Sequence, residues 1–512
     1  HLAKRKKLEY LDLRETRITD AGLAHLKSLR RLSRLNLSRT PITQAGLTHF
    51  SSLRKLQALN LTGTRVSSLA PLSRITRLER LTLTETRITA DDTKALSSLP
   101  GLESVTLPVA ARTDTALAHL GRVTSLTDLD LTKGAVTDAG LRQLARLARL
   151  NTLHLSETKI GDAGVQHLAK LTALRTLDLS KTRISDRALI TLAKLKKLRW
   201  LTLSNTAVSD AGVRHLAADA ALRSLDLRKT KITAAAFKAL KRMKGLTHVQ
   251  VDPRLRGDDY LAVWIAGGDY MLDLKNSRVS LAGLKGLRGR KVRFIELSGT
   301  PIGDAALPIL AQVRELANLG LAKTRITDAG LPHLVRLRSL SQLNLSKTRV
   351  TDAAVPVLLK LKELEVCLLN GTGLTDQGLA RLAAHPRLVG LGVGQTKVSA
   401  RGLNRLMRAG RIMYLDVSHT RISDGWLKRV PGVARLKQLM LGHTKIGDAG
   451  LLSLSRMGAL RYLDLTSTRI TDAGLKHLRR LRLWRLVLKG TKVSDRAVKA
   501  LQQAQPQLKI TR

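Results

Sequence analysis

A segment of about 24 residues recurs along the whole chain, and this period constrains the fold more than any other feature. Residues 11–34 read LDLRETRITDAGLAHLKSLRRLSR, and the same order of leucines then returns. A Thr closes each L-x-L-x-x-T segment and marks the phase of 17 repeats: Thr16, Thr40, Thr64, Thr86, Thr158, Thr182, Thr206, Thr230, Thr300, Thr324, Thr348, Thr372, Thr396, Thr420, Thr444, Thr468 and Thr491. With four degenerate repeats around positions 110, 134, 254 and 277, the chain holds about 21. A fixed period of this kind predicts a solenoid.

One repeat predicts a strand followed by a short helix. Leu35 and Leu37 alternate with Asn36 and Ser38, which is typical of a strand with one buried face. The Thr hydroxyl can tie down the backbone where the chain leaves the strand. Three residues later, Ser, Thr or Gly is followed in most repeats by Asp, which predicts a helix start whose acid complements the helix dipole. Stacked repeats would form a parallel sheet on a concave face and short helices on a convex face.

The pattern L-x-x-L-x-L-x-x-T-x-I, as in Leu32, Leu35, Leu37, Thr40 and Ile42, resembles the leucine-rich-repeat family over essentially the whole chain. The T-D-A-G-L-x-H-L-x-x-L segment is similar to repeats of bacterial proteins, although Thr stands where most of the family has Asn. The resemblance implies an α/β solenoid, curved or superhelical as a horseshoe, that serves as a protein-interaction scaffold. Function is inferred here from fold alone, which is an analogy.

We predict one solenoid over residues 1–512, with irregular repeats around 249–300. Residues 258–270 read DDYLAVWIAGGDY and are either a decayed repeat with a longer helix or a junction between two solenoid halves. His1 and Leu2 occupy the slot of His25 and Leu26, so the chain opens inside a repeat and is expected to be an N-terminally truncated fragment.

The charge is strongly positive and unevenly placed. Lys and Arg number 89 against 39 Asp and Glu, a net charge of +50. The residues two, four and six before the phase position should face the concave side, where seven bases meet ten acids: Asp12, Asp128, Asp130, Asp178, Asp226, Asp252, Asp273, Glu296, Asp416 and Asp464. The positive charge is therefore expected on the outside.

Part of this charge forms a basic rim. The residue after the phase position is Arg or Lys in 14 of 21 repeats: Arg17, Arg65, Arg87, Lys159, Arg183, Lys231, Arg278, Arg325, Arg349, Lys397, Arg421, Lys445, Arg469 and Lys492. Such a row is either a track for a polyanion, such as nucleic acid, lipid head groups or an acidic polymer, or a solvated edge whose aliphatic stems cover the core. The rim has no aromatic residues, which disfavours nucleic acid, because its binders use aromatic rings for stacking.

Nothing in the sequence indicates catalysis. Phosphate-binding loop, nucleophile-elbow and H-E-x-x-H motifs are not found, so we predict no enzyme and no cofactor. His419 and His443 share one slot in adjacent repeats near Asp416, but without clear further ligands we predict no metal site. Cys367 replaces a core leucine and should be buried and inert. No apolar run is long enough to span a membrane and no leader is apparent, so the compartment is not predicted.

The best candidate for a partner site lies on the concave face near the C-terminal repeats. Of 12 aromatic residues, five fall in one concave column: Tyr10, Trp200, Phe294, Tyr414 and Tyr462. Exposed Tyr and Trp on rigid elements are frequent contact anchors, although cross-strand packing also explains them. The predicted partner-binding residues are Tyr414, Asp416, His419, Gln438, Met440, His443, Tyr462, Asp464 and Trp200. We therefore predict a scaffold that binds another protein there, with polyanion binding by the rim and convex face as the alternative.

Overall fold

The computed structural model describes residues 5–217, 222–267, 270–431 and 433–512. The chain divides into two compact units, His1–Asp252 with Ala266–Gly268 (unit 1) and Pro253–Ile265 with Asp269–Arg512 (unit 2). The slot predicted for His1 and Leu2 lies outside the described residues.

Unit 1 contains a parallel sheet in which the described strands follow chain order. Leu11 pairs with Leu35, and Leu35 pairs with Leu59, so successive repeats stack in register. The strands are β1 (Tyr10–Asp12), β2 (Arg34–Asn36), β3 (Ala58–Asn60), β4 (Arg80–Thr82), β5 (Ser104–Thr106), β6 (Asp128–Asp130), β7 (Thr152–His154), β8 (Thr176–Asp178), β9 (Trp200–Thr202), β10 (Ser224–Asp226) and β11 (His248–Gln250).

Unit 2 repeats this arrangement with a second parallel sheet, also in chain order among the described strands. They are β12 (Met271–Asp273), β13 (Phe294–Glu296), β14 (Asn318–Gly320), β15 (Gln342–Asn344), β16 (Val366–Leu368), β17 (Gly390–Gly392), β18 (Tyr414–Asp416), β19 (Gln438–Met440), β20 (Tyr462–Asp464), β21 (Arg485–Val487) and β22 (Lys509–Thr511). A strand thus occurs in each of the 21 predicted repeats, and β22 covers the half-repeat that follows.

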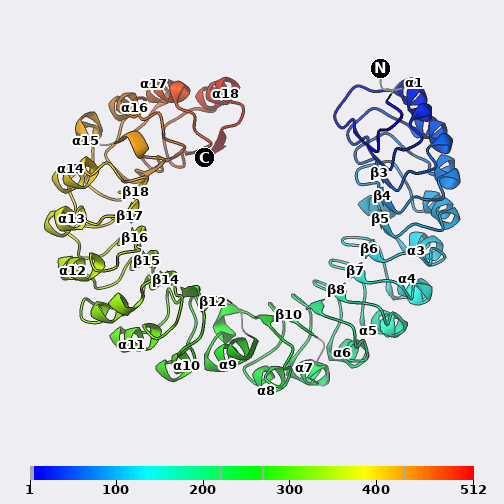
Figure 1. Ribbon diagram of the computed structural model, residues 1–512, viewed down its shortest axis with the longest axis horizontal. Helices are drawn as coiled ribbons and strands as arrows, with labels where there is room; N and C mark the ends of the chain where they lie inside the picture. Colours follow the sequence, from blue (N-terminus) through cyan, green and yellow to red (C-terminus); the bar gives the residue numbers. More distant parts are fainter. Residues whose placement is uncertain (1–4, 218–221, 268–269, 432) are drawn as a thin grey trace. The chain divides into compact units, whose positions relative to one another are not determined.

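Short helices cover the other face. Within each unit, Figure 1 shows the strands on the inner side of an arc and the helices on its outer side. The α-helices are α1 (Asp20–Leu23), α2 (Gln44–Leu47), α3 (Asp114–Leu120), α4 (Asp138–Leu141), α5 (Asp162–Gln166), α6 (Asp186–Leu192), α7 (Asp210–Leu216), α8 (Ala236–Leu240), α9 (Asp258–Gly267), α10 (Leu281–Lys285), α11 (Leu307–Leu310), α12 (Val355–Leu358), α13 (Asp376–Leu382), α14 (Ala400–Arg408), α15 (Asp424–Arg429), α16 (Asp448–Leu454), α17 (Asp472–Leu475) and α18 (Asp495–Ala504).

Tighter 3₁₀ turns complete or replace these helices in many repeats. They are η2 (Ala24–Ser28), η3 (Thr48–Ser52), η4 (Ala70–Arg74), η5 (Asp91–Ser98), η6 (Val109–Ala111), η7 (Arg142–Arg146), η8 (His167–Lys170), η9 (Pro253–Leu255), η10 (Asp304–Ala306), η11 (Leu331–Arg336), η12 (Asp352–Ala354), η13 (Val433–Arg435) and η14 (Lys476–Arg480). Among the described helices, none is long and apolar enough to cross a membrane.

The leucines of the repeat form the core. In the second repeat, for example, Leu35, Leu37, Ile42 and Leu47 are almost completely buried. Burying one such side chain stabilises the fold by about 1.5–3 kcal/mol, so the interior of each unit is a continuous apolar layer between strands and helices.

The phase-marking Thr residues fix the turn after each strand through a side-chain hydrogen bond. All 17 donate the hydroxyl proton to the carbonyl oxygen three residues earlier, at 2.5–2.7 Å. This confirms the predicted tie between the Thr side chain and the departing backbone. The residue before this Thr takes a positive φ, as at Lys323 (57°), so the chain turns sharply there.

An aspartate at the start of the helical segment links neighbouring repeats. Fourteen such aspartates accept a hydrogen bond from the backbone N–H of the helix-capping residue one repeat later, and in 12 of them the Ser or Thr hydroxyl of that residue donates as well. From the sequence these acids were expected only to complement their own helix, and the structure adds this inter-repeat contact.

The prediction of one continuous solenoid over residues 1–512 stays a prediction, as does the expectation that the chain is a fragment. Each unit by itself has the predicted layers, with a parallel sheet on one face and short helices on the other.

Candidate functional site

Eight of the nine predicted partner-binding residues come from three adjacent repeats of unit 2. The register of β18, β19 and β20 places Tyr414, Gln438 and Tyr462 in one row across the sheet. Asp416, Met440 and Asp464 form the neighbouring row. These six side chains are half-buried, so they belong to one continuous part of the inner sheet face, which we call the concave patch.

The tyrosines of the concave patch are anchored by neighbouring side chains. The Tyr414 hydroxyl donates to Sδ of Met440 at 3.6 Å. Burial raises the pKa of the Tyr414 phenol to about 12, and the charge of Asp416 adds to the shift. Burial also raises the pKa of Tyr462. Both phenols are therefore neutral donors and acceptors at physiological pH.

Trp484 extends this aromatic surface and was missed in the sequence analysis. Its ring centroid lies 6.0 Å from that of Tyr462, with the two planes tilted by 51°. The Trp484 side chain is 49% exposed, which is unusual for so large an apolar group. It directly precedes β21, outside the three inward-facing columns from which the candidates were chosen.

His419 and His443 stack at the margin of the concave patch. Their ring centroids are 4.0 Å apart and their planes differ by 13°. Burial lowers the pKa of His419, and the neighbouring His443 lowers it further. Ring nitrogens donate their lone pairs within the ring plane, so two parallel stacked rings do not aim at one ion. Among the residues that the structure describes, no cluster of three or more His, Cys, Asp or Glu could hold a metal.

The acids of the inner face are largely engaged by the backbone. Eight of the ten accept the N–H two residues later in the chain, which closes the end of the strand. Asp464 accepts both the N–H and the hydroxyl of Thr466 through Oδ1, at 2.8 and 2.6 Å. Most acids of the concave face therefore stabilise the ends of their own strands.

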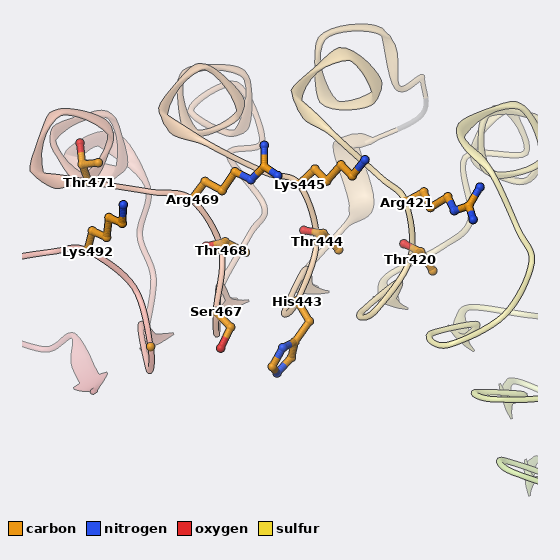
Figure 2. A pocket seen from close by; sticks show the side chains of 11 residues that line it. Thr420, Arg421, His443, Thr444, Lys445, Ser467, Thr468, Arg469, Thr471 and Lys492 are labelled. Atoms are coloured by element: carbon orange, nitrogen blue, oxygen red, sulfur yellow. The ribbon is translucent and has the colours of Figure 1, made fainter.

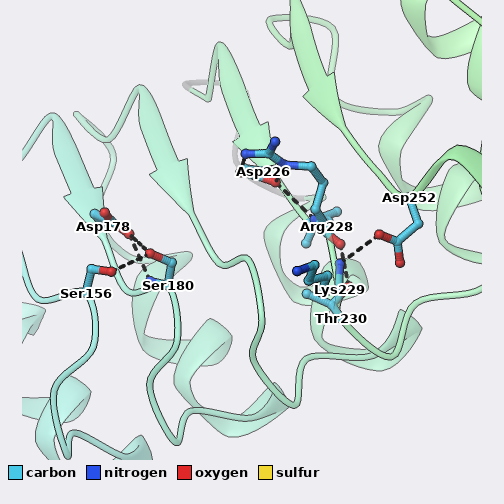
Figure 3. Close-up of polar contacts among 9 residues, drawn as sticks. Ser156, Asp178, Ser180, Asp226, Arg228, Lys229, Thr230 and Asp252 are labelled. Atoms are coloured by element: carbon cyan, nitrogen blue, oxygen red, sulfur yellow. Dashed lines mark hydrogen bonds and ion pairs between the residues drawn. The ribbon is translucent and has the colours of Figure 1, made fainter. Parts of the chain in front are cut away.

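Figure 3 shows the same behaviour in unit 1. The Ser180 N–H and hydroxyl both donate to Oδ1 of Asp178, at 2.9 and 2.6 Å. Arg228 forms an ion pair with Asp226, with 2.6 Å between Nη2 and Oδ2. These acids are satisfied within the protein.

The glycines at 390, 392 and 394 are covered by neighbouring side chains. Asn370 donates its side-chain amide to Asp416 at 3.0 Å, across the intervening repeat. The side-chain oxygen Oδ1 of Asn370 accepts the N–H of Gly394 at 2.6 Å. Since glycine has no side chain to block it, Asn370 covers the backbone of this repeat, and all three glycines are buried.

Trp200, the ninth predicted residue, belongs to unit 1. It begins β9 and is 48% exposed. The structure therefore does not unite it with the concave patch, and a role for Trp200 in the same site stays a prediction.

The basic rim forms a groove in the last repeats. Residues of four successive repeats line a cavity of about 660 Å³, including Arg421, Lys445, Arg469 and Lys492. Figure 2 shows these four side chains in a row, with Thr420, Thr444 and Thr468 beneath them and His443 at the lower margin. All four cations are exposed, in agreement with the predicted row.

Comparison with known families identifies the repeat. Two family models, both described as leucine rich repeat, match residues 6–66 and 148–208, and residues 124–145 and 460–480. The chain contains leucine-rich repeats. Together with the parallel sheets and short helices, this makes the fold an α/β leucine-rich-repeat solenoid. No curated protein matches the sequence of this chain.

Solved structures with similarity to these leucine-rich repeats come from several kinds of protein. The plant peptide hormone receptor RGFR1 in complex with RGF2 is 15% identical, with 100% of this chain and 92% of that chain covered and a TM-score of 0.48. A TLR13–ssRNA13 complex is 16% identical, with coverage of 98% and 88% and a TM-score of 0.45. An internalin (inlF) from Listeria monocytogenes is 21% identical, with coverage of 71% and 88% and a TM-score of 0.37.

The leucine-rich repeat explains how distant residues come together. Positions 24 residues apart become neighbours across one strand spacing of about 4.8 Å. Tyr414, Gln438 and Tyr462 were therefore placed correctly by the repeat phase alone. The hydrogen bond between Asn370 and Asp416 spans two repeats and depends on the conformation of a side chain, so the 24-residue period did not predict it.

Proposed function

We propose that this protein is a non-enzymatic interaction scaffold that binds another protein through the concave patch. The observation that carries the proposal is the continuous surface of Tyr414, Met440 and Tyr462 on adjacent strands, extended by Trp484. Aromatic residues and Met are enriched at protein interfaces, and rigid strands hold them with little entropy left to lose on binding.

The polar groups of the patch indicate what kind of segment fits it. Asp464 uses Oδ1 for its own turn. This leaves Oδ2 as an acceptor beside the Tyr462 ring. The neutral Tyr414 and Tyr462 hydroxyls add hydrogen-bonding capacity. A complementary partner would place an apolar side chain against the rings and a hydrogen-bond donor or cation against Asp464.

Cross-strand packing explains the tyrosines less well than binding does. Gln438 separates Tyr414 from Tyr462 in their row, so the two rings are not direct cross-strand neighbours. The aromatic pair in this region is that of Tyr462 and Trp484. The Tyr414 ring is not part of that pair, so aromatic packing does not explain its presence.

Site-specific photocrosslinking tests the proposal. A benzophenone amino acid replaces Gln438 in the centre of the concave patch, and the protein is irradiated in a lysate of its source organism. Gln342 lies on β15 of the same unit and has the same residue type, so it provides a matched control position. We expect one protein to be captured strongly at position 438 and weakly at position 342.

Truncation of the rings then tests whether the capture depends on the patch. The double variant Tyr414→Ala/Tyr462→Ala should abolish capture, whereas Tyr10→Ala/Phe294→Ala, which truncates aromatics of the same column on β1 and β13, should preserve it. Equal capture at 438 and 342, or capture that survives loss of both tyrosines, would contradict the proposal.

A further inference from the structure

The C-terminal part of the basic rim is its longest uninterrupted stretch. Five consecutive repeats carry a cation after the phase Thr, at the positions Lys397, Arg421, Lys445, Arg469 and Lys492. Elsewhere the run never exceeds two repeats. With a strand spacing of about 4.8 Å, the five cations span roughly 19 Å in a line. The groove of about 660 Å³ lies along four of them.

These cations are not neutralised by the protein. Among the described residues, none of the five forms an ion pair or a side-chain hydrogen bond. In unit 1 the residues before the phase position include Glu15, Glu85 and Glu157. Glu15 and Glu157 form ion pairs with Arg39 and Lys181, which hold the same position in the next repeat. Along the C-terminal run the corresponding positions are Gln395, His419, His443, Ser467 and Gly490, none of which is acidic.

The remaining polar groups of the groove define its donors. The hydroxyls of Thr420, Thr444 and Thr468 already donate to backbone carbonyls at 2.6–2.7 Å, so they have no proton left for a ligand. Thr471 donates both its N–H and its hydroxyl to the Asp448 carboxylate, so neither donor is left for a ligand. The groove therefore offers the four cationic side chains, with the Ser467 hydroxyl and the His443 imidazole beside them.

We infer that this groove binds an unbranched chain of closely spaced phosphate groups, of the kind found in inorganic polyphosphate. Because the cations lie in a single row, they are complementary to a linear anionic chain and would engage a broad anionic surface less completely. The groove lining contains no Phe, Tyr or Trp, and its one ring, the imidazole of His443, is a smaller surface than the aromatic platforms on which single-stranded nucleic acids usually stack. The four cations of the groove are distinct from the six side chains of the concave patch, and the groove meets the margin of that patch at His443. The inference does not depend on the proposed protein partner.

Titration of fluorescent polyphosphate against the full chain tests the inference. The probe is inorganic polyphosphate of about 20 phosphates, at near-physiological salt. The test variant is Arg421→Glu/Lys445→Glu/Arg469→Glu. We expect it to weaken binding at least tenfold and to flatten the dependence of Kd on salt, because fewer counterions are released.

A second basic groove provides the matched control. Arg30, Arg54, Lys55, Arg74 and Arg77 line a cavity of about 1020 Å³ in unit 1. The variant Arg54→Glu/Lys55→Glu/Arg74→Glu changes the net charge by the same amount as the test variant. We expect it to change the affinity less than threefold. If both variants weaken binding equally, the attraction is only a property of the total charge, and the inference is overturned.

Two further arms complete the test. Oligouridylate with the same number of phosphates should bind at least fivefold more weakly than polyphosphate, whereas tighter binding of the oligonucleotide would overturn the preference for a base-free chain.

If the glutamate variant fails to fold, as judged by circular dichroism, the variant Arg421→Gln/Lys445→Gln/Arg469→Gln replaces it, and we again expect weaker binding. Undiminished binding by a folded variant would overturn the inference.

Discussion

The carboxylate of Asp448 is clasped by Thr471 of the next repeat: the Thr471 N–H donates to Oδ1 at 2.8 Å, and its hydroxyl donates to Oδ2 at 2.7 Å. The same contact recurs along both units. It ties the start of one helical segment to the start of the next, beyond the end of the strands. Neighbouring repeats are thus held at two places rather than by the sheet alone.

Loss of this clasp should loosen the repeats locally. We expect Asp448→Ala to lower the free energy of opening at the Thr471 amide by about 1–3 kcal/mol, because a partly buried N–H and hydroxyl lose their acceptor. Hydrogen exchange at that amide measures the effect. Thr471→Ser keeps both donors and should exchange like the unaltered protein. Unchanged protection in Asp448→Ala would show that this contact does not help to hold the two repeats together.

The equivalent clasp should depress a measurable pKa in the last repeats. Hydrogen bonds from Ser494 hold the pKa of Asp472 below its ordinary value of 3.8. The ionised form is thus favoured by folding, and its stabilising contribution is present above pH 3.8 and lost as the pH falls through the lower folded-state value. A carboxyl NMR titration should show a rise toward 3.8 in Ser494→Ala. An unchanged pKa would exclude the Ser494 hydroxyl as a cause, since the backbone N–H of this residue is retained in the variant.

The turn before each phase Thr stores local strain that can be released. Lys323 adopts a φ of 57°, a region that favours glycine over side chains with a Cβ. We expect Lys323→Gly to stabilise the protein by about 0.5 kcal/mol and Lys323→Val to destabilise it by about 1 kcal/mol or more, because β-branching crowds this conformation further. Urea denaturation of the unaltered protein and the two variants gives the order of their free energies of unfolding. The reverse order would contradict this description of the turn.

The single cysteine should be chemically silent in the folded chain. Cys367 is completely buried in β16, and burial raises its thiol pKa to about 12. At pH 8 almost no thiolate is present, so a thiol reagent such as iodoacetamide should label the native protein very slowly and the urea-unfolded protein rapidly. Fast labelling of the native protein would show that this repeat opens readily.

The repeat phase alone predicted the strands and the surface rows. Tyr414, Gln438 and Tyr462 follow from a 24-residue step, and so does the row of Arg421, Lys445 and Arg469, because stacked strands keep equal positions side by side. The hydrogen bond from each phase Thr to the backbone was also predictable from the sequence, since donor and acceptor lie three residues apart in one turn.

Other features could not be derived from the phase. The clasp between Asp448 and Thr471 depends on the distance between two helix starts, which the leucine pattern does not set. The hydrogen bond from the Ser418 N–H to Asp416 was not predicted, because the sequence does not determine whether this carboxylate faces solvent or the backbone, and the observed turn decides between the two. Trp484 escaped notice because it lies outside the regular inward-facing columns.

The most direct test of the central claim is the affinity of the protein captured at position 438, measured by calorimetry with the purified partner. We predict that Tyr414→Ala/Tyr462→Ala weakens binding about 30-fold or more, as loss of central aromatic anchors typically does. The rim variant Arg421→Glu/Lys445→Glu/Arg469→Glu should leave the affinity within about threefold. If the tyrosine variant binds normally and the rim variant does not, the concave patch is not the partner site.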